Sequence, residues 1–148
     1  MRLLILDTNL ISRLVSGSKY YQRLHDLVTQ SKVKIVIHDV IFAETLSVLL
    51  KSKENQLFGK VDKERIVLDQ ETKSEVLKQL EVLTSVLNVD VVTIGRKEVD
   101  KTLEKVKDVC ISAFDALTLV VANSIKPDLI ATDDKLFRNR ALQKGYNI

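Results

Sequence analysis

Short apolar runs alternate with longer amphipathic segments along almost the whole chain of 148 residues. The runs are rich in Val, Ile and Leu and have the length of buried strands, whereas the segments between them carry apolar residues at helical spacing. Strands separated by helices are typical of βαβ units, whose parallel sheet is covered by helices on both faces. The predicted strands are residues 3–6, 34–37, 90–93 and 129–131, with residues 146–148 as a weaker fifth.

The predicted helices lie between and after these strands. Residues 73–87 show the pattern well, because Val76 and Leu80 fall on one helical face. The sequence therefore predicts one α/β domain over residues 1–148, with a mainly parallel sheet of about five strands and helices on both faces. Further helices are predicted at residues 20–31, 40–51, 98–109, 112–124 and 133–144, and the charged stretch 51–70 is predicted to be a loop or a helical excursion.

The charge and the cysteine content exclude several classes of protein. A formal net charge of +3 permits an anionic partner such as RNA without requiring one. The lone Cys110 cannot form a disulfide within the chain, and His25 and His38 alone cannot complete a zinc site. The longest apolar stretches are well short of a membrane span, and no signal peptide is visible. We therefore expect a cytoplasmic protein that does not associate with membranes.

Carboxylates follow the ends of two predicted strands. Asp7 comes directly after the first strand, and Asp133 and Asp134 follow the strand at residues 129–131. Each of these acids also has an ordinary alternative role at a helix N-terminus. Asp7 can cap the helix that follows it, and Thr132 can cap the last helix with the two acids in its first turn.

Two further carboxylates lie on mostly apolar helices. Glu44 is more than one turn into the helix after the second strand, where Asp39 is the expected N-cap, and Asp115 is in the helix before the fourth strand. A carboxylate on such a helix is costly to bury unless a cation or hydrogen-bond donors face it. The alternatives are a narrow solvent-exposed stripe for Glu44 and a capping role beside Ser112 for Asp115.

These acids are predicted to meet at one edge of the sheet. The carboxyl ends of parallel strands all lie along the same edge, and ligands of open α/β sheets bind there. Carboxylates gathered in one place repel one another, so that one or more would be protonated unless a cation is bound. Mg²⁺ and Mn²⁺ prefer carboxylate and water oxygens, and the scarcity of Cys and His favours such a hard cation over zinc.

Four segments resemble those of the PIN domain family, most closely the single-domain toxin ribonucleases of the VapC type. They are LILDTN near the N-terminus, FAE in the helix after the second strand, FDAL in a late helix, and LIATDDKLF near the C-terminus. Their order and spacing cover residues 3–137, and the four together are fairly specific, whereas LDTN alone is a weak motif. The chain departs from the family pattern at Leu136, where a further acid is often found.

The resemblance implies which residues form the site. Asp7, Glu44 and Asp115 match the three most regular acids of the family. A Thr-x-Asp pattern places the fourth acid on Asp134, but the adjacent Asp133 leaves that assignment open between the two. Asp7 and Asp115 are the expected direct ligands of the metal, with Glu44 and Asp134 binding a second ion or orienting waters. The residues expected to support them are Thr8, Asn9, Thr132 and Asp133.

The resemblance also implies a function. It is that of an endoribonuclease that depends on Mg²⁺ or Mn²⁺, with one or two ions per active site, and hydrolyses RNA phosphodiester bonds. The protein would be the toxin of a toxin–antitoxin pair, would have a small antitoxin protein as its partner, and would form a homodimer. Cationic residues beside the first and last motifs are expected to contact RNA phosphates, namely Arg13, Lys19, Lys135, Arg138 and Arg140.

Other readings of the same acids stay open. A PIN-like nuclease that processes RNA would carry the same carboxylates, whereas a catalytically weak module that binds RNA or protein would be expected to have lost one. A dehalogenase-like domain fits poorly, because it needs a second acid where Asn9 stands. A nucleotide-binding fold is disfavoured, since the four scattered glycines form no glycine-rich loop.

Overall fold

The computed structural model describes residues 1–59 and 67–148 and confirms the predicted α/β class. Its sheet is parallel throughout, in the order β3-β2-β1-β4. The residues 146–148 form no regular strand, although the Ile130 N–H donates to the Asn147 carbonyl at 2.9 Å. The strands of the described residues are β1 (Arg2–Leu6), β2 (Val33–His38), β3 (Asp90–Val92) and β4 (Leu129–Ala131).

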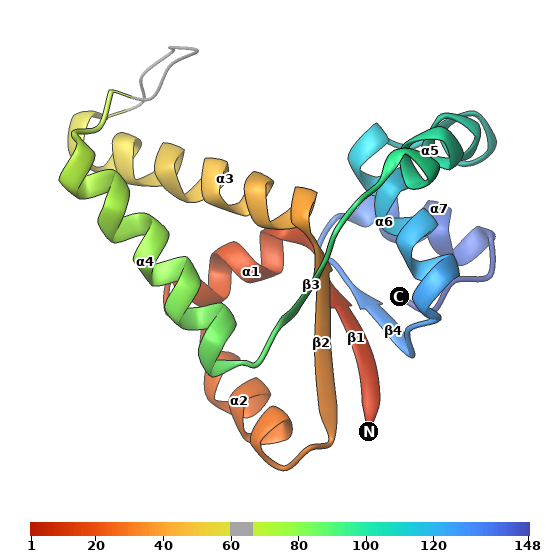
Figure 1. The fold of residues 1–148 in the computed structure, drawn as a ribbon, viewed down its shortest axis with the longest axis horizontal. Coiled ribbons are helices and arrows are strands. Elements are labelled where there is room, and N and C mark those ends of the chain that lie inside the picture. Colours follow the sequence, from red (N-terminus) through yellow and green to blue (C-terminus); the bar gives the residue numbers. More distant parts are fainter. Residues whose placement is uncertain (60–66) are drawn as a thin grey trace.

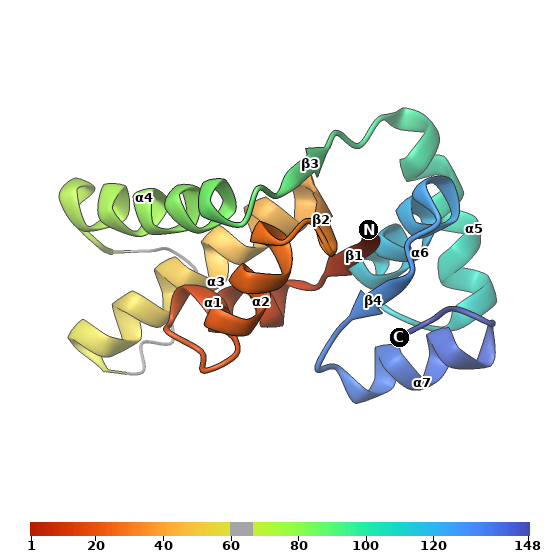
Figure 2. The same ribbon diagram turned by 90° about the horizontal axis from the view of Figure 1, so that it is seen from below.

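Helices cover both faces of this sheet, as predicted. Helices α1 to α4 lie on one side of the strands and α5 to α7 on the other, as both views show (Figure 1, Figure 2). In the described residues the helices are α1 (Thr8–Val15), α2 (Tyr21–Thr29), α3 (Asp39–Phe58), α4 (Gln70–Val86), α5 (Arg96–Val109), α6 (Ala113–Ile125) and α7 (Lys135–Gln143). None of the described helices has by itself the length and apolar character of a membrane span; α5 and α6, which meet at 111°, pass that test only as a pair.

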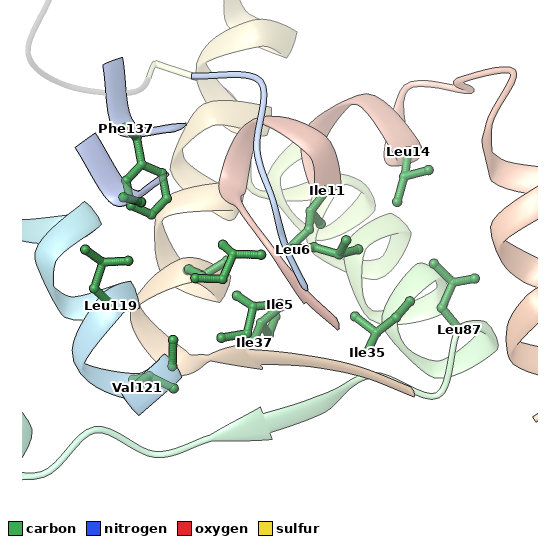
Figure 3. Packing of buried hydrophobic residues seen from close by; sticks show 14 of the residues in the cluster. Ile5, Leu6, Ile11, Leu14, Ile35, Ile37, Leu87, Leu119, Val121 and Phe137 are labelled. Atoms are coloured by element: carbon green, nitrogen blue, oxygen red, sulfur yellow. The ribbon is translucent and has the colours of Figure 1, made fainter. Parts of the chain in front are cut away.

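The core lies on both faces of the two central strands. The end of β1, at Ile5 and Leu6, and nearly all of β2 are buried there, since successive residues of a strand point to opposite faces and both faces are covered. Burial of this apolar surface is the main favourable contribution to folding. Figure 3 shows this packing for Ile5, Leu6, Ile35 and Ile37 of the sheet with Leu14, Leu119 and Phe137 of the flanking helices and with Leu87, directly after α4.

Helix α3 is longer than predicted and begins differently. It runs without a break to Phe58, so the first part of the charged stretch 51–70 is helical. Residues 60–66 of that stretch lie outside the described residues. The prediction of Asp39 as the N-cap is wrong, because the His38 side chain accepts the hydrogen bond from the Ile41 N–H instead. A ring nitrogen thus takes the place of the usual carboxylate or hydroxyl cap.

The strand order places one point of the sheet in a special position. From β1 the chain proceeds to β2 and β3 on one side, and then crosses to β4 on the other side of β1. Ligands of open α/β sheets bind at the carboxyl ends of the strands where the order reverses in this way. Here that point lies between the ends of β1 and β4, next to Asp7 and Thr132.

Candidate active site

Asp7 lies at the end of β1 and is buried, with 8% of its surface exposed. Its N–H donates to the Ala131 carbonyl at 3.0 Å, which ties it to β4. Its Oδ1 accepts from the Thr8 N–H at 2.8 Å, so Asp7 caps α1. Its Oδ2 accepts from the Thr132 hydroxyl at 2.7 Å. The carboxylate therefore has a capping role and also faces the point where the strand order reverses.

Glu44 reaches this point from α3. Its Oε2 accepts a hydrogen bond from the Thr8 hydroxyl at 2.7 Å. Thr8 is itself buried, and its backbone N–H donates to Asp7. Thr8 therefore connects the carboxylates of Asp7 and Glu44, which are far apart in the sequence, and Glu44 is half-buried rather than on a solvent-exposed stripe.

Asp115 faces the same point from the first turn of α6. Ser112 caps that helix, since its hydroxyl accepts from the Asp115 N–H at 3.1 Å and donates to Asp115 Oδ2 at 2.7 Å. Burial raises the pKa of the Asp115 carboxyl, the hydrogen bond from Ser112 opposes this, and the negative charges of Asp7, Asp134 and Glu44 raise it further. The four predicted acids are thus close enough to interact electrostatically.

The adjacent acids after β4 have different partners. Asp134 caps α7, because its Oδ1 accepts from the Phe137 N–H at 2.9 Å, so the prediction of Thr132 as this cap is wrong. The Thr132 hydroxyl instead accepts from the Asp134 N–H at 3.0 Å while it donates to Asp7. Asp133 forms an ion pair with Arg13 at the surface. Of the two acids, Asp134 is the one whose negative charge raises the pKa of Asp115.

His38 is a buried residue whose role sequence reasoning missed, since it was considered only as a zinc ligand. It ends β2, and 1% of its surface is exposed. Nδ1 accepts from the Ile41 N–H at 3.2 Å, and Nε2 lies 3.1 Å from the Thr118 hydroxyl of α6. Burial lowers the pKa of His38 to about 4, against the opposing charge of Asp39, so the ring is neutral at pH 7. Its place directly before a helix was the signal for a cap.

The PIN domain family model matches residues 4–142, which is most of the chain. The chain belongs to the PIN domain family. The resemblance seen in the four sequence segments is therefore confirmed. Among curated proteins, none matches the sequence.

Solved structures support the same fold for this PIN domain. PAE2754 from Pyrobaculum aerophilum is 18% identical with a TM-score of 0.62, over 94% of this chain and 79% of that one. VapBC2 from Rickettsia felis, bound to a DNA fragment from its promoter, is 17% identical with a TM-score of 0.63, over 93% and 92%. VapC20 from Mycobacterium tuberculosis, a toxin that cleaves the sarcin–ricin loop, is 13% identical with a TM-score of 0.58, over 97% and 95%.

The oxygen donors at this edge of the PIN domain suit a hard divalent cation. Hydroxyl groups of Thr132, Thr8 and Ser112 hold three of the carboxylates, and none of the four predicted acids has an ion-pair partner within the described residues. Burial and, to a smaller extent, the neighbouring carboxylates raise the pKa of Asp115, and a bound cation would favour its ionised form. In residues 1–59 and 67–148, no three acidic, His or Cys side chains are grouped closely enough to hold an ion as they stand. The four carboxylates suit a divalent cation in their chemistry and location, and some of their side chains would change rotamer to bind it.

The predicted RNA-contacting residues lie at the surface. Beside Lys19 in the sequence, Tyr20 is 62% exposed beneath the Lys19 ammonium, whereas Tyr21 packs against the core and stacks on His25, with ring centroids 5.9 Å apart. Asn9 and Leu136 are also exposed. The cations expected to contact RNA are all exposed, and among them only Arg13 belongs to a described ion pair. They are Arg13, Lys19, Lys135, Arg138 and Arg140.

Proposed function

We propose that this PIN domain is an endoribonuclease that depends on Mg²⁺ or Mn²⁺ and acts as the toxin of a toxin–antitoxin pair. The observation that carries the proposal is the electrostatic interaction of Asp115 with Asp7, Asp134 and Glu44 near the point where the strand order reverses. Each of the four carboxylates accepts hydrogen bonds from neutral donors. Acids that serve only to stabilise a fold are commonly paired with cations or placed at helix ends. Three of these acids do lie at helix N-termini, but none of the four belongs to an ion pair among the described residues. The negative charges of Asp7, Asp134 and Glu44 also act on Asp115, which suits a site completed by a metal ion.

The metal ion, when bound, lowers the pKa of a water and stabilises the charge that develops on the phosphodiester. Asp7 and Asp115 are the proposed direct ligands, and Glu44 and Asp134 hold a second ion or orient water. Thr8 and Thr132 then orient these carboxylates by the hydrogen bonds described above. Asp133 is a supporting residue that keeps Arg13 at the rim, and Asn9 extends this polar edge.

An acidic site needs cations at its rim in order to bind a polyanion. Three exposed cations lie on α7, directly after Asp134, and Lys19 lies after α1. Contacts from such residues to phosphates are independent of sequence and weaken as salt is added. We propose that this rim binds the RNA backbone, with Lys135, Arg138 and Arg140 on one side and Arg13 and Lys19 on the other.

The proposed partners follow from the VapC-like fold. VapBC2 contains a VapB chain and a DNA fragment from its promoter. By analogy, we propose a small antitoxin protein that covers the acidic edge, a homodimer of this chain, and a cytoplasmic location in which RNA is accessible.

The test is Mn²⁺ binding, measured by calorimetry for the wild type and for Asp7→Asn. The expected result is binding by the wild type and a loss of at least about 100-fold in affinity for the variant, because a ligand carboxylate is lost. Asp69→Asn is the matched control. Asp69 caps α4 through the Thr72 N–H at 2.7 Å, and Asn retains that acceptor. The control should bind Mn²⁺ as the wild type does.

Failure of the wild type to bind Mn²⁺ at millimolar concentration would contradict the proposal. Asp7 would then be a helix cap, and a non-catalytic module that binds RNA or protein would be favoured. If Mn²⁺ binds, cleavage of ribosomal and transfer RNA in the presence of Mn²⁺ separates a nuclease from a metal-binding module. Growth arrest on expression, relieved by a co-expressed antitoxin, then separates a toxin from an RNA-processing enzyme.

A further inference from the structure

His38 ends β2 at the same edge of the sheet as Asp7, Glu44, Asp115 and Asp134, although it is not an acid. The strand register pairs Ile5 with Val36, so Asp7 and His38 are each two residues further along neighbouring strands. The imidazole is buried and contacts α3 on one side and α6 on the other. These two helices carry Glu44 and Asp115.

The hydrogen bonds of His38 agree on one form of the ring. Nδ1 faces the Ile41 N–H at 3.2 Å and therefore has no hydrogen of its own. The Thr118 hydroxyl donates its hydrogen to the Phe114 carbonyl at 3.2 Å. Its oxygen lies 3.1 Å from Nε2 and can therefore accept a hydrogen bond from that nitrogen. His38 is accordingly the neutral tautomer with a hydrogen on Nε2, and both of its nitrogens are satisfied.

We infer that His38 is a positioning residue of the proposed metal site, and that its ring sets the spacing between α3 and α6. Ile41 is three residues before Glu44, and Thr118 is three residues after Asp115, so each contact lies about one helical turn from an acid. A neutral ring also adds no positive charge that would compete with a cation. The inference rests on the proposed function, because a spacing matters only if the two acids act together.

Two substitutions separate the link between helices from the cap of α3. His38→Asn retains an acceptor for the Ile41 N–H, since Asn is a good N-cap, but it is too short to reach Thr118. His38→Gln can still reach Thr118 with its amide, but it loses the favoured capping geometry. If His38 positions the site, His38→Asn should lower Mn²⁺ affinity about 10-fold or more relative to the wild type, although it should be more stable than His38→Gln. His38→Gln should bind Mn²⁺ more tightly than His38→Asn does.

Thr118 provides the complementary test. Thr118→Val removes the hydroxyl and leaves His38 free to cap α3, so it should lower Mn²⁺ affinity as His38→Asn does. Thr118→Ser keeps the hydroxyl and should bind as the wild type does. The double variant His38→Asn/Thr118→Val should be no worse than either single variant, because the two changes break the same contact.

The opposite order of affinities would overturn the inference. If His38→Asn binds Mn²⁺ as the wild type does and only His38→Gln is impaired, His38 is merely a cap. A ¹⁵N spectrum that shows the hydrogen on Nδ1 would contradict the hydrogen bond from His38 Nε2 to the Thr118 hydroxyl. Additive losses of Mn²⁺ affinity in the double variant would show that His38 and Thr118 do not act through one contact. If the wild type binds no Mn²⁺, the proposed function fails first and the positioning role falls with it, an outcome distinct from failure of the variants alone.

Discussion

The two ends of α3 each hold a glutamate, and their surroundings differ. Glu54 is completely buried. Its carboxylate accepts hydrogen bonds from the Lys51 ammonium at 3.1 Å and from the Val67 N–H at 3.1 Å. Glu44 is half-buried, accepts from the Thr8 hydroxyl at 2.7 Å, and acts on Asp115 through its negative charge. One carboxylate is balanced by a protein cation, and the other is gathered with further carboxylates.

This difference separates a structural acid from a candidate ligand. A buried carboxylate with its own cation and backbone donor gains nothing from a metal ion, and removal of its charge leaves the partner unbalanced. A carboxylate held by a neutral hydroxyl beside other acids retains an unbalanced charge, so a cation stabilises it. The structure places the two glutamates ten positions apart on one helix, and their neighbours distinguish them.

The largest expected effect is that of Asp115→Asn on catalysis. The substitution removes a proposed metal ligand without removing the contact with Ser112, so metal-dependent RNA cleavage should fall by about 1,000-fold or more. The measurement is the single-turnover cleavage rate at saturating Mn²⁺, with far-UV circular dichroism to show that the fold persists. Cleavage at the wild-type rate would contradict the assignment of Asp115 to the site.

The next effect is on stability and sharpens the contrast between the two glutamates. Glu54→Gln should lower the free energy of unfolding by about 1–3 kcal/mol, because the buried side chain loses its charge-assisted hydrogen bond from Lys51. It should leave Mn²⁺ affinity within about twofold of the wild type. Glu44→Gln should do the reverse, with a change below about 1 kcal/mol and a clear loss of Mn²⁺ affinity. Urea unfolding and calorimetry measure the two quantities, and equal effects on both would break the comparison.

Acid should destabilise the folded protein through His38, which caps the end of α3 near Glu44. The folded state holds the pKa of His38 near 4, below its ordinary value of 6.5, so the unfolded chain binds a proton that the folded chain does not. The free energy of unfolding therefore falls with decreasing pH, by about 2 kcal/mol between pH 7 and pH 5. His38→Asn should lack this slope in urea titrations at several pH values. An equal slope in both proteins would show that other groups cause it.

The smallest effect concerns Asp115→Asn without metal. Burial and neighbouring carboxylates raise the pKa of Asp115, so its ionised form is disfavoured in the folded state, and this cost is present above the ordinary pKa of an Asp. Because the side chain is partly exposed, removal of the charge should raise Tm at neutral pH by only about 1–3 °C. Differential scanning calorimetry in EDTA gives the value. A clear fall in Tm would instead favour a purely capping role for Asp115.

Much of the fold was predictable from the sequence because the signal is local. The apolar runs at β1, β2 and β4 have the length and residue types of buried strands, and the intervening periodicity is helical. The predicted weak strand at residues 146–148 did not form a regular strand, because the backbone hydrogen bond from the Ile130 N–H to the Asn147 carbonyl does not extend into a ladder. The N-cap of α3 failed because a buried imidazole competed successfully with Asp39, which instead accepts from the Ile94 N–H at 3.2 Å.

The sequence by itself determined that acids stand at the carboxyl ends of parallel strands, since that follows from where each strand stops. Only the tertiary structure decided which partner each acid takes. The hydrogen bond from Thr132 to Asp7 joins residues 125 positions apart, and the one from Thr8 to Glu44 joins residues 36 apart. Such contacts depend on β4 lying beside β1, and no local pattern of residues encodes that strand order.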